Sequence, residues 1–154
     1  MTTDPARPCL ACAIVTGATI PPGGAIVETP FFHAHQDVAY PVPGFVIVAA
    51  RRHIHSLDEL TDTEAHDLID LMRRLRQAQR AVLGIDYVYY FYNEDTTHHF
   101  HAWMIPRYPW MQEFGRAIES VRPALHYAQQ HHTTPAHQAA VEHAAEQLRA
   151  ALQS

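Results

Sequence analysis

The chain has 154 residues and a formal net charge of -5 at pH 7. This length predicts a single domain whose core needs no disulfide framework, and the acidic balance argues against nucleic acid or an anionic membrane surface as a partner. No apolar run reaches the roughly 18 to 20 residues of a membrane span, and the start of the chain lacks the apolar segment of a signal peptide. We therefore expect a cytoplasmic protein with no membrane partner.

The first candidate site is formed by Cys9 and Cys12, the two cysteines of the chain. Their C-x-x-C spacing suits either a redox pair or half of a zinc site. The chain also has 13 histidines, so imidazole is the expected source of any further metal ligands.

Short strands are predicted after the cysteines. Residues 13–17 and 25–29 are apolar stretches on either side of a Pro-Pro-Gly-Gly turn, which indicates a hairpin. A third short strand is expected over residues 31–36. Residues 44–50 form a continuous apolar run of strand length, which predicts a central strand of a sheet.

A long helix is predicted between Thr61 and Gly84. Thr61 and Glu64 have the spacing of a capping box, and apolar residues then recur at helical spacing. Gly84 suits the end of the helix, because glycine readily adopts the left-handed conformation that follows many helices.

Two strands joined by a short loop are predicted after this helix. Residues 86–92 are rich in aromatic side chains that favour strands, and residues 93–97 form the loop. A hairpin at this loop would bring Thr96 and Thr97 close to His99.

The second strand of this hairpin contains the candidate catalytic or metal-binding histidines. His99, His101 and Trp103 alternate along it, so their side chains are expected on one face. A histidine there can attack phosphorus, hold a proton near neutral pH or ligate a metal.

The C-terminal part is rich in alanine, glutamine, glutamate and histidine at helical spacing. One helix is predicted over residues 117–129, and Pro123 is expected to kink or restart it. The last helix begins with Thr134 as the N-cap and Pro135 as the first helical residue.

Together these elements predict an α+β fold, in which one major helix lies across an antiparallel β-sheet and a helical extension follows. The domain is expected to span residues 1–115, and the C-terminal extension, residues 116–154, is expected to pack on the same domain.

The order of these motifs resembles that of the histidine triad (HIT) family of nucleotide hydrolases and transferases. The matching features run from Cys9 to about Arg107, and they are the C-x-x-C start, Asp37 after an early strand, the apolar strand that ends in Arg-Arg-His53, and the strand His99-Phe-His101-Ala-Trp103-Met-Ile-Pro-Arg107. The resemblance implies a HIT-like fold.

The resemblance also implies chemistry at His101. In the family, the middle histidine of a His-x-His-x-His motif attacks the α-phosphorus of a nucleotide conjugate and forms a nucleotidyl-histidine, which water or an acceptor resolves. We therefore expect a nucleotide hydrolase or nucleotidyltransferase with phosphoramidate or dinucleoside polyphosphate substrates. His101 would be the nucleophile, and His99 would brace the site or ligate a metal.

Two positions depart from the family pattern. Trp103 replaces the third histidine, and Phe45 stands where many members carry a further active-site histidine. Fewer hydrogen-bond donors are then available to a developing phosphorane. Phe45 is interpreted as a core residue, and Trp103 as a core residue in preference to a base-stacking one.

These departures keep other functions open. The main alternative is a non-catalytic nucleotide-binding or regulatory protein with a HIT-like fold. A redox role for the thiol pair, or a transferase in which Trp103 shapes a different pocket, are further options.

A metal site is implied by the resemblance. In bacterial members the C-x-x-C pair can bind zinc together with a histidine after the apolar strand and the first histidine of the triad. The corresponding residues are Cys9, Cys12, His53 and His99, a Cys2His2 set that suits a structural zinc. The alternative is a pair of reduced thiols beside unligated imidazoles.

Substrate contacts are implied as well. Asp37 is expected near the ribose hydroxyls, and Thr96 and Thr97 near the phosphate, with a strand-end acid and backbone-bonding threonines as the alternatives. Trp103 borders the same face, and Arg107 is expected to reach a phosphate or carboxylate unless it is a structural arginine. We also expect a homodimer, as in the family, because such a sheet has an edge to cover.

Overall fold

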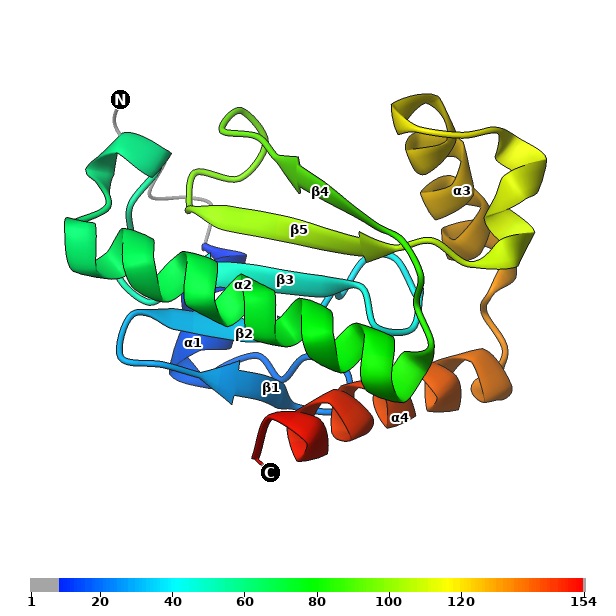
Figure 1. Ribbon diagram of the computed structural model, residues 1–154, viewed down its shortest axis with the longest axis horizontal. Coiled ribbons are helices and arrows are strands. Elements are labelled where there is room, and N and C mark those ends of the chain that lie inside the picture. The colour runs from blue at the N-terminus through cyan, green and yellow to red at the C-terminus, as the bar shows by residue number, and fades with distance from the viewer. Residues whose placement is uncertain (1–8, 154) are drawn as a thin grey trace.

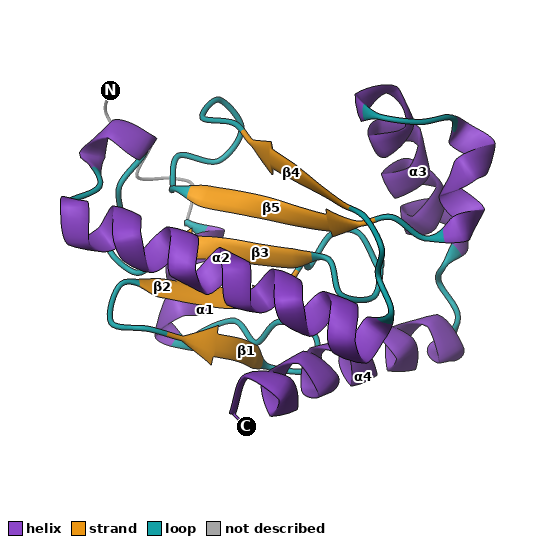
Figure 2. Cartoon of the chain, viewed as in Figure 1, coloured by secondary structure: helices purple, strands orange, loops and turns teal. Residues whose placement is uncertain are grey.

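The computed structural model of the protein describes residues 9–153. It contains one sheet with the strand order β1-β2-β3-β5-β4, in which all neighbours are antiparallel. The strands are β1 (Ala25–Glu28), β2 (Phe32–Gln36), β3 (Val46–Ala50), β4 (Val88–Tyr92) and β5 (His101–Pro106). The helices are α1 (Leu10–Thr16), α2 (Asp62–Leu83), α3 (Ile118–His131) and α4 (Pro135–Gln153), with short 3-10 turns η1 (Leu57–Glu59) and η2 (Pro109–Phe114). The predicted α+β class is confirmed (Figure 2).

The two faces of the sheet have different roles. α2 crosses one face and α1 lies on the other (Figure 1). Alternation along the strands directs Ala34, Val48 and Met104 into the main apolar core beneath α2. The side chains of Ile47 and His101 lie on the opposite face, beside α1. The candidate site therefore lies on the face that α2 does not cover.

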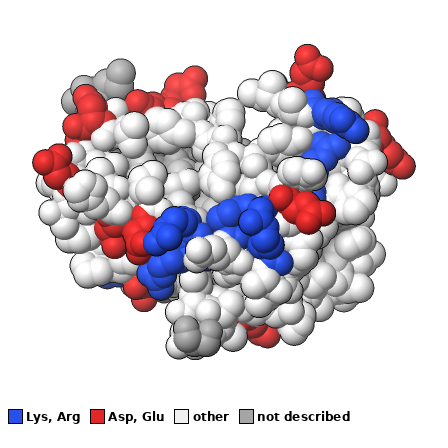
Figure 3. Space-filling view, viewed as in Figure 1, with Lys and Arg blue, Asp and Glu red and all other residues white. Residues whose placement is uncertain are grey.

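α2 has the boundaries that its sequence predicts. The side chain of Thr61 accepts from the backbone N–H of Glu64, which completes the capping box, and Gly84 ends the helix with a φ of 64°. Basic side chains gather over α2 on its exposed face (Figure 3). Arg73 pairs with Asp70 there, so this basic surface lies away from the candidate site.

The predicted strand over residues 13–17 is wrong, because this segment belongs to α1. The Sγ atom of Cys9 accepts from the backbone N–H of Cys12 at the start of the helix, and Gly17 ends it with a φ of 84°. A short apolar run is compatible with a helix or a strand, and here the cap at Cys9 decides for the helix.

The other strand predictions are confirmed, with one change at the histidine strand. β5 begins at His101, so His99 precedes it. The backbone N–H of Phe100 donates to the carbonyl of Ile54 at 2.6 Å instead of to a strand partner. The ring of Phe100 packs in the core beneath α2, so its neighbours His99 and His101 both face the opposite side.

The C-terminal helices differ slightly from the prediction. α3 continues through Pro123 without a break, although a proline at this position cannot donate to the carbonyl of Glu119. α4 starts at Pro135 as predicted. None of the helices within residues 9–153 has the length and apolar character needed to cross a bilayer.

α4 packs back onto the sheet. Its side chains Ala145 and Leu148 belong to the main core. Gly23, with a φ of 75°, lies so close to α4 that a Cβ atom there would be 2.7 Å from the Cβ of Ala145. The close approach therefore requires glycine at this turn. The division of the chain near residue 115 stays a prediction.

Candidate functional site

Four potential metal ligands meet where α1, the exit of β3 and the start of β5 converge. They are Cys9, Cys12, His53 and His99, and their ligand atoms all lie within 4.8 Å of one another. Cys9 begins α1, and α1 turns Cys12 back toward it. The sequence prediction named this same set of side chains.

The distances fit a tetrahedral ion. The Nδ1 atom of His99 lies 3.4 Å from both sulfur atoms and 3.1 Å from the Nδ1 atom of His53. The sulfur of Cys12 lies 3.2 Å from that same His53 nitrogen. Zinc bonds of about 2.0–2.3 Å require ligand atoms separated by roughly 3.3–3.8 Å. These residues can therefore hold zinc after small side-chain adjustments.

The ring of His99 is oriented for ligation. Its Nε2 atom lies 2.6 Å from the carbonyl oxygen of Ala50, so Nε2–H donates to this oxygen. The lone pair of a neutral ring then lies on Nδ1, among the other ligand atoms. Burial lowers the pKa of His99, which favours this neutral form.

A bidentate ion pair between Arg52 and Glu64 holds the segment that carries His53. The guanidinium of Arg52 donates to both carboxylate oxygens of Glu64 at 2.9 and 2.8 Å. These hydrogen bonds lower the pKa of Glu64 to about 2, so the pair stays charged at neutral pH. It connects the exit of β3 to the first turn of α2 and so positions His53.

The thiols are free cysteines in this structure. Burial, followed by the neighbouring Cys9, raises the pKa of Cys12 to about 11. A neutral thiol is therefore expected in the absence of a cation, and a bound zinc ion would favour the thiolate.

A cavity of about 330 Å³ lies beside the four potential metal ligands, on the same face of the sheet. Its lining includes His101, His35, Asp37, Thr97 and Trp103, together with apolar side chains of α1. The structure thus brings together most of the predicted site residues. Thr96 also lines this cavity, and its hydroxyl donates to the side-chain oxygen of Asn93 at 2.5 Å.

The imidazole of His101 is held in one tautomer. Its Nδ1 atom lies 2.9 Å from the carbonyl oxygen of His99, so Nδ1–H donates to this oxygen. In the neutral ring Nε2 then carries the lone pair. His101 is 9% exposed and lines the cavity, so the geometry provides an accessible nitrogen nucleophile.

Asp37 lies at the end of β2, where the chain turns into a loop. One carboxylate oxygen, Oδ2, accepts from the backbone N–H groups of Ala39 and Tyr40 at 3.0 and 2.7 Å. Its neighbour Gln36 fixes the loop by donating to the carbonyl of Val42. Burial raises the pKa of Asp37 from 3.8 to about 6, although the two backbone hydrogen bonds oppose this shift.

The sequence prediction missed His33 and His35. Both are buried on β2, and their Nδ1 atoms lie 3.2 Å apart. Burial, with His33 and His101 as further causes, lowers the pKa of His35 to about 3, so a neutral imidazole lines the cavity beside His101. Their His-x-His spacing within a predicted strand was a signal that could have identified them.

Phe45 and Trp103 form an aromatic wall. Phe45 is fully buried, as predicted for a core residue, and its ring lies 5.5 Å from that of Trp103. Trp103 is only half-buried and borders the cavity. It therefore has both a packing role and a surface available to a ligand.

Arg107 does not reach this cavity. Its guanidinium donates to the hydroxyl of Tyr89 at 2.8 Å and to the carbonyl of Gly115 at 3.1 Å. These bonds tie the end of β5 to β4 and to the segment before α3. The predicted phosphate contact is replaced by this structural role.

Comparisons with known proteins support the fold. No protein-family model matches the sequence, and no curated protein matches it. Among solved structures, a zinc-bound histidine triad family protein from Mycobacterium smegmatis has a TM-score of 0.67 at 23% identity, and the match covers 94% of this chain and 93% of that one.

Two further structures match over similar lengths. A Hit-like protein involved in cell-cycle regulation from Bartonella henselae has a TM-score of 0.66 at 18% identity, with 92% of this chain and 95% of that one covered. A hypothetical histidine triad nucleotide-binding protein from Sulfolobus tokodaii has a TM-score of 0.67 at 15% identity, with 94% and 92% covered. The chain therefore has the histidine triad fold.

Proposed function

We propose that the protein is a nucleotide hydrolase or nucleotidyltransferase that acts at the α-phosphate of a nucleotide conjugate. The single observation that carries the proposal is His101, whose Nδ1–H is bonded to the carbonyl of His99 while its other nitrogen is free to face the cavity. The histidine triad fold supports it, because the Sulfolobus tokodaii structure of that fold is described as nucleotide-binding.

In the proposed reaction, Nε2 of His101 attacks the α-phosphorus. The N–P bond forms, the bond from phosphorus to the leaving group breaks, and the leaving group takes up a proton from solvent. Water, or another hydroxyl acceptor, then attacks the phosphorus and loses a proton as the N–P bond breaks. The products of the hydrolytic route are a nucleoside monophosphate and the protonated leaving group.

Thr97 and Thr96 are proposed to contact the phosphate, and Trp103 to border it. The test of the proposed function is release of a nucleoside monophosphate from a panel of adenosine and guanosine conjugates, including phosphoramidates and dinucleoside polyphosphates. Absence of release from the whole panel would contradict the proposal.

His35 is proposed to donate a hydrogen bond to the phosphate, in place of the third histidine that Trp103 replaces. Loss of one such donor costs about a hundredfold in rate where the donor acts in the transition state. We expect His35→Ala to lower kcat by about tenfold to a hundredfold, since this donor is one of several. His66→Ala serves as a matched control, because His66 is an exposed histidine on α2 and is absent from this cavity. Equal kcat values for His35→Ala and wild type would contradict the role.

Asp37 is proposed to accept hydrogen bonds from the ribose hydroxyls. Its carboxyl is charged only above a pKa of about 6, so nucleoside binding should strengthen as the pH rises through that value. Calorimetry with adenosine and guanosine, from about pH 5 to about pH 7.5, tests this, because neither nucleoside titrates there. In Asp37→Asn we expect weaker binding at pH 7 and no change of affinity near pH 6.

The same variant separates binding from stability. The folded-state pKa of Asp37 lies above its ordinary value of 3.8, so its contribution to stability falls as the pH rises from 3.8 to about 6 and stays low above that. Asp37→Asn should therefore not lower the unfolding temperature at pH 7. A large loss of stability would indicate that the carboxylate has a structural role instead.

We further propose that Cys9, Cys12, His53 and His99 hold a structural zinc ion. The Mycobacterium smegmatis structure with the same fold is zinc-bound. The ion would join α1 to the sheet and fix the backbone of His99, whose carbonyl accepts from His101. Zinc would thus support the nucleophile without contacting the substrate.

A homodimer is also proposed, through the β4 edge of the sheet. β4 pairs with β5 on one side only, and Tyr87 and Tyr90 beside this edge are 69% and 55% exposed. An edge strand with exposed aromatic side chains is a suitable surface for a second copy.

A non-catalytic nucleotide-binding protein is the second candidate. The observation that favours it is the aromatic pair Phe45 and Trp103, where additional histidines would otherwise supply donors to the transition state. It predicts nucleotide binding without turnover, before and after substitution of His101.

A further inference from the structure

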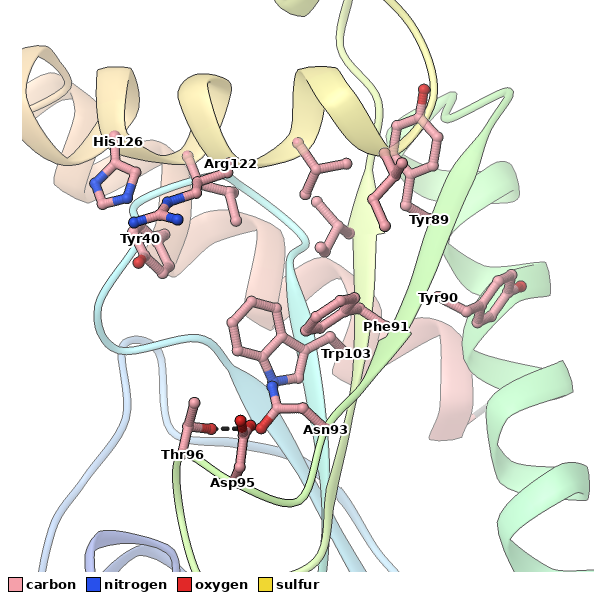
Figure 4. A pocket seen from close by; sticks show the side chains of 14 residues that line it. Tyr40, Tyr89, Tyr90, Phe91, Asn93, Asp95, Thr96, Trp103, Arg122 and His126 are labelled. Carbon is pink, nitrogen blue, oxygen red and sulfur yellow. Dashed lines mark hydrogen bonds between the residues drawn. The ribbon is translucent and has the colours of Figure 1, made fainter.

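A second and larger cavity adjoins the His101 cavity, and the proposed reaction gives it no role. Its volume is about 520 Å³, within the range of small-molecule sites, which is about 300–1,000 Å³. It lies between α3 and the strands β4 and β5 (Figure 4). Residues from these three elements and from the two loops at its ends line it.

The two cavities are neighbours. Tyr40, Thr96 and Trp103 line both of them. The ring of Trp103 lies 6.2 Å from that of His101. The larger cavity therefore borders the place where a leaving group would separate from a phosphorus atom at His101.

The middle of the larger cavity is aromatic and apolar. The rings of Phe91 and Trp103 lie 5.2 Å apart, and Ile105, Val121 and Leu125 complete the wall. Figure 4 shows the side chains of Phe91 and Trp103 facing the space beneath α3. A wall of this kind favours a flat apolar ring.

The two ends of the cavity carry opposite charges. Asp95 and Thr96 lie at one end, where Thr96 also lines the His101 cavity, and Arg122 and His126 lie at the other end, beside Tyr40 (Figure 4). The guanidinium of Arg122 has no hydrogen-bond or ion-pair partner among residues 9–153.

Trp103 also offers an unused donor. Its Nε1 atom is buried and has no hydrogen-bond partner within the described part of the chain. A buried N–H without an acceptor is unfavourable unless a ligand or water supplies one. This donor belongs to a residue that lines both cavities.

We propose that the larger cavity binds the leaving group of the substrate, and that this group is an aromatic amine bearing an acidic substituent. The proposal rests on the proposed function. The amine nitrogen lies at the acidic end, next to His101, the ring lies against Phe91 and Trp103, and the acidic substituent reaches Arg122. The P–N bond to this amine breaks as the bond from His101 to phosphorus forms, and the amine takes up a proton from solvent.

Direct binding is tested without catalysis. In a Trp110→Phe variant, Trp103 is the remaining tryptophan of the two in the chain, so its fluorescence reports on the cavity. We expect 3-phenylpropanoate to quench it, and 3-phenylpropylamine to bind at least about tenfold more weakly, as loss of one charge-assisted hydrogen bond implies. Arg122→Gln should remove this preference. Arg80→Gln is the matched control, because Arg80 is an exposed helical arginine on α2.

Space in the cavity is tested with a second pair of variants. Ile118 lines the cavity and is 71% exposed, whereas Ile69 is 66% exposed on α2 and lies outside the cavity. Ile118→Phe should weaken binding of 3-phenylpropanoate and Ile69→Phe should not. Both substitutions are at exposed positions, so both variants are expected to fold. Equal affinities in the two variants would overturn the proposal.

Kinetics distinguish this proposal from the proposed function. The substrates are adenosine and guanosine phosphoramidates of 3-(4-aminophenyl)propanoate and of aniline, which differ in the acidic substituent alone. Wild type should have the lower KM for the 3-(4-aminophenyl)propanoate conjugates, and Arg122→Gln should reduce this preference by about tenfold. Turnover with no preference, and no binding of 3-phenylpropanoate, would overturn the leaving-group assignment alone. Binding without any release of nucleoside monophosphate would overturn the proposed function.

Discussion

His101→Ala is expected to reduce release of nucleoside monophosphate by about a thousandfold or more, because it removes the nitrogen that forms the covalent intermediate. The side chain lines the cavity without supporting the apolar core beneath α2. Nucleotide affinity should therefore change little. The measurements are steady-state release from the conjugate panel and calorimetric binding of a nucleoside monophosphate.

His98→Ala is the matched control for this substitution. His98 is an exposed histidine just before the strand, and it is absent from the lining of the His101 cavity. Its replacement should leave release unchanged. If His101→Ala turned over conjugates at the wild-type rate, His101 would not be the nucleophile.

Removal of zinc is expected to have the second large effect. A ligand that binds only the folded state stabilises it by about 4 kcal/mol when its free concentration is about a thousandfold above Kd. For a chain of about 150 residues this corresponds to a fall in unfolding temperature of roughly 10 °C on chelation. The purified protein should contain zinc by elemental analysis, and Cys12→Ser should lose both the metal and the additional stability.

The control for the metal site is His55→Ala. The ring of His55 lies 5.3 Å from that of His53, but His55 is outside the cluster of four ligands. This variant should keep its zinc. A wild-type protein without zinc, whose unfolding temperature is unaffected by a chelator, would contradict the metal site. A Cys9–Cys12 disulfide that forms and is reduced reversibly would then favour a redox role.

Zinc removal should also lower the reaction rate. The proposed metal ligand His99 provides the carbonyl that accepts from Nδ1 of His101. Movement of this carbonyl in the apo protein would remove the hydrogen bond that fixes the tautomer of His101. In the apo protein kcat should fall more than nucleotide affinity does. This split separates a positioning role for zinc from direct contact with the substrate.

The elements predicted correctly are those whose signals are local. The capping box at Thr61 and the terminal Gly84 define α2 within the sequence itself, and both caps occur in the structure. α1 was missed because its start depends on the sulfur of Cys9 accepting from Cys12. Apolar runs of this length do not separate helix from strand.

The site was predictable where its residues belong to short motifs that can be recognised in the sequence. Cys9, Cys12, His53 and His99 do come together. These motifs lie far apart in the chain, so the resemblance to a known family was needed to connect them. His35 was not predicted. Its His-x-His spacing marks it as a candidate, but strand pairing is what places β2 beside β3, which in turn pairs with the strand of His101. Arg107 has the structural role that the sequence analysis kept as the alternative, and its partners Tyr89 and Gly115 are determined by tertiary packing. The larger cavity depends on where α3 lies against the sheet, which no local pattern indicates.

The most direct test of the proposed reaction at His101 is to trap its covalent intermediate. The protein is mixed with a reactive adenosine or guanosine phosphoramidate, quenched in base to preserve the P–N bond, digested and examined by mass spectrometry. We expect a nucleoside monophosphate adduct on His101, which is absent from His101→Ala. An adduct on another residue, or rapid turnover with no adduct at His101 at any time, would contradict it.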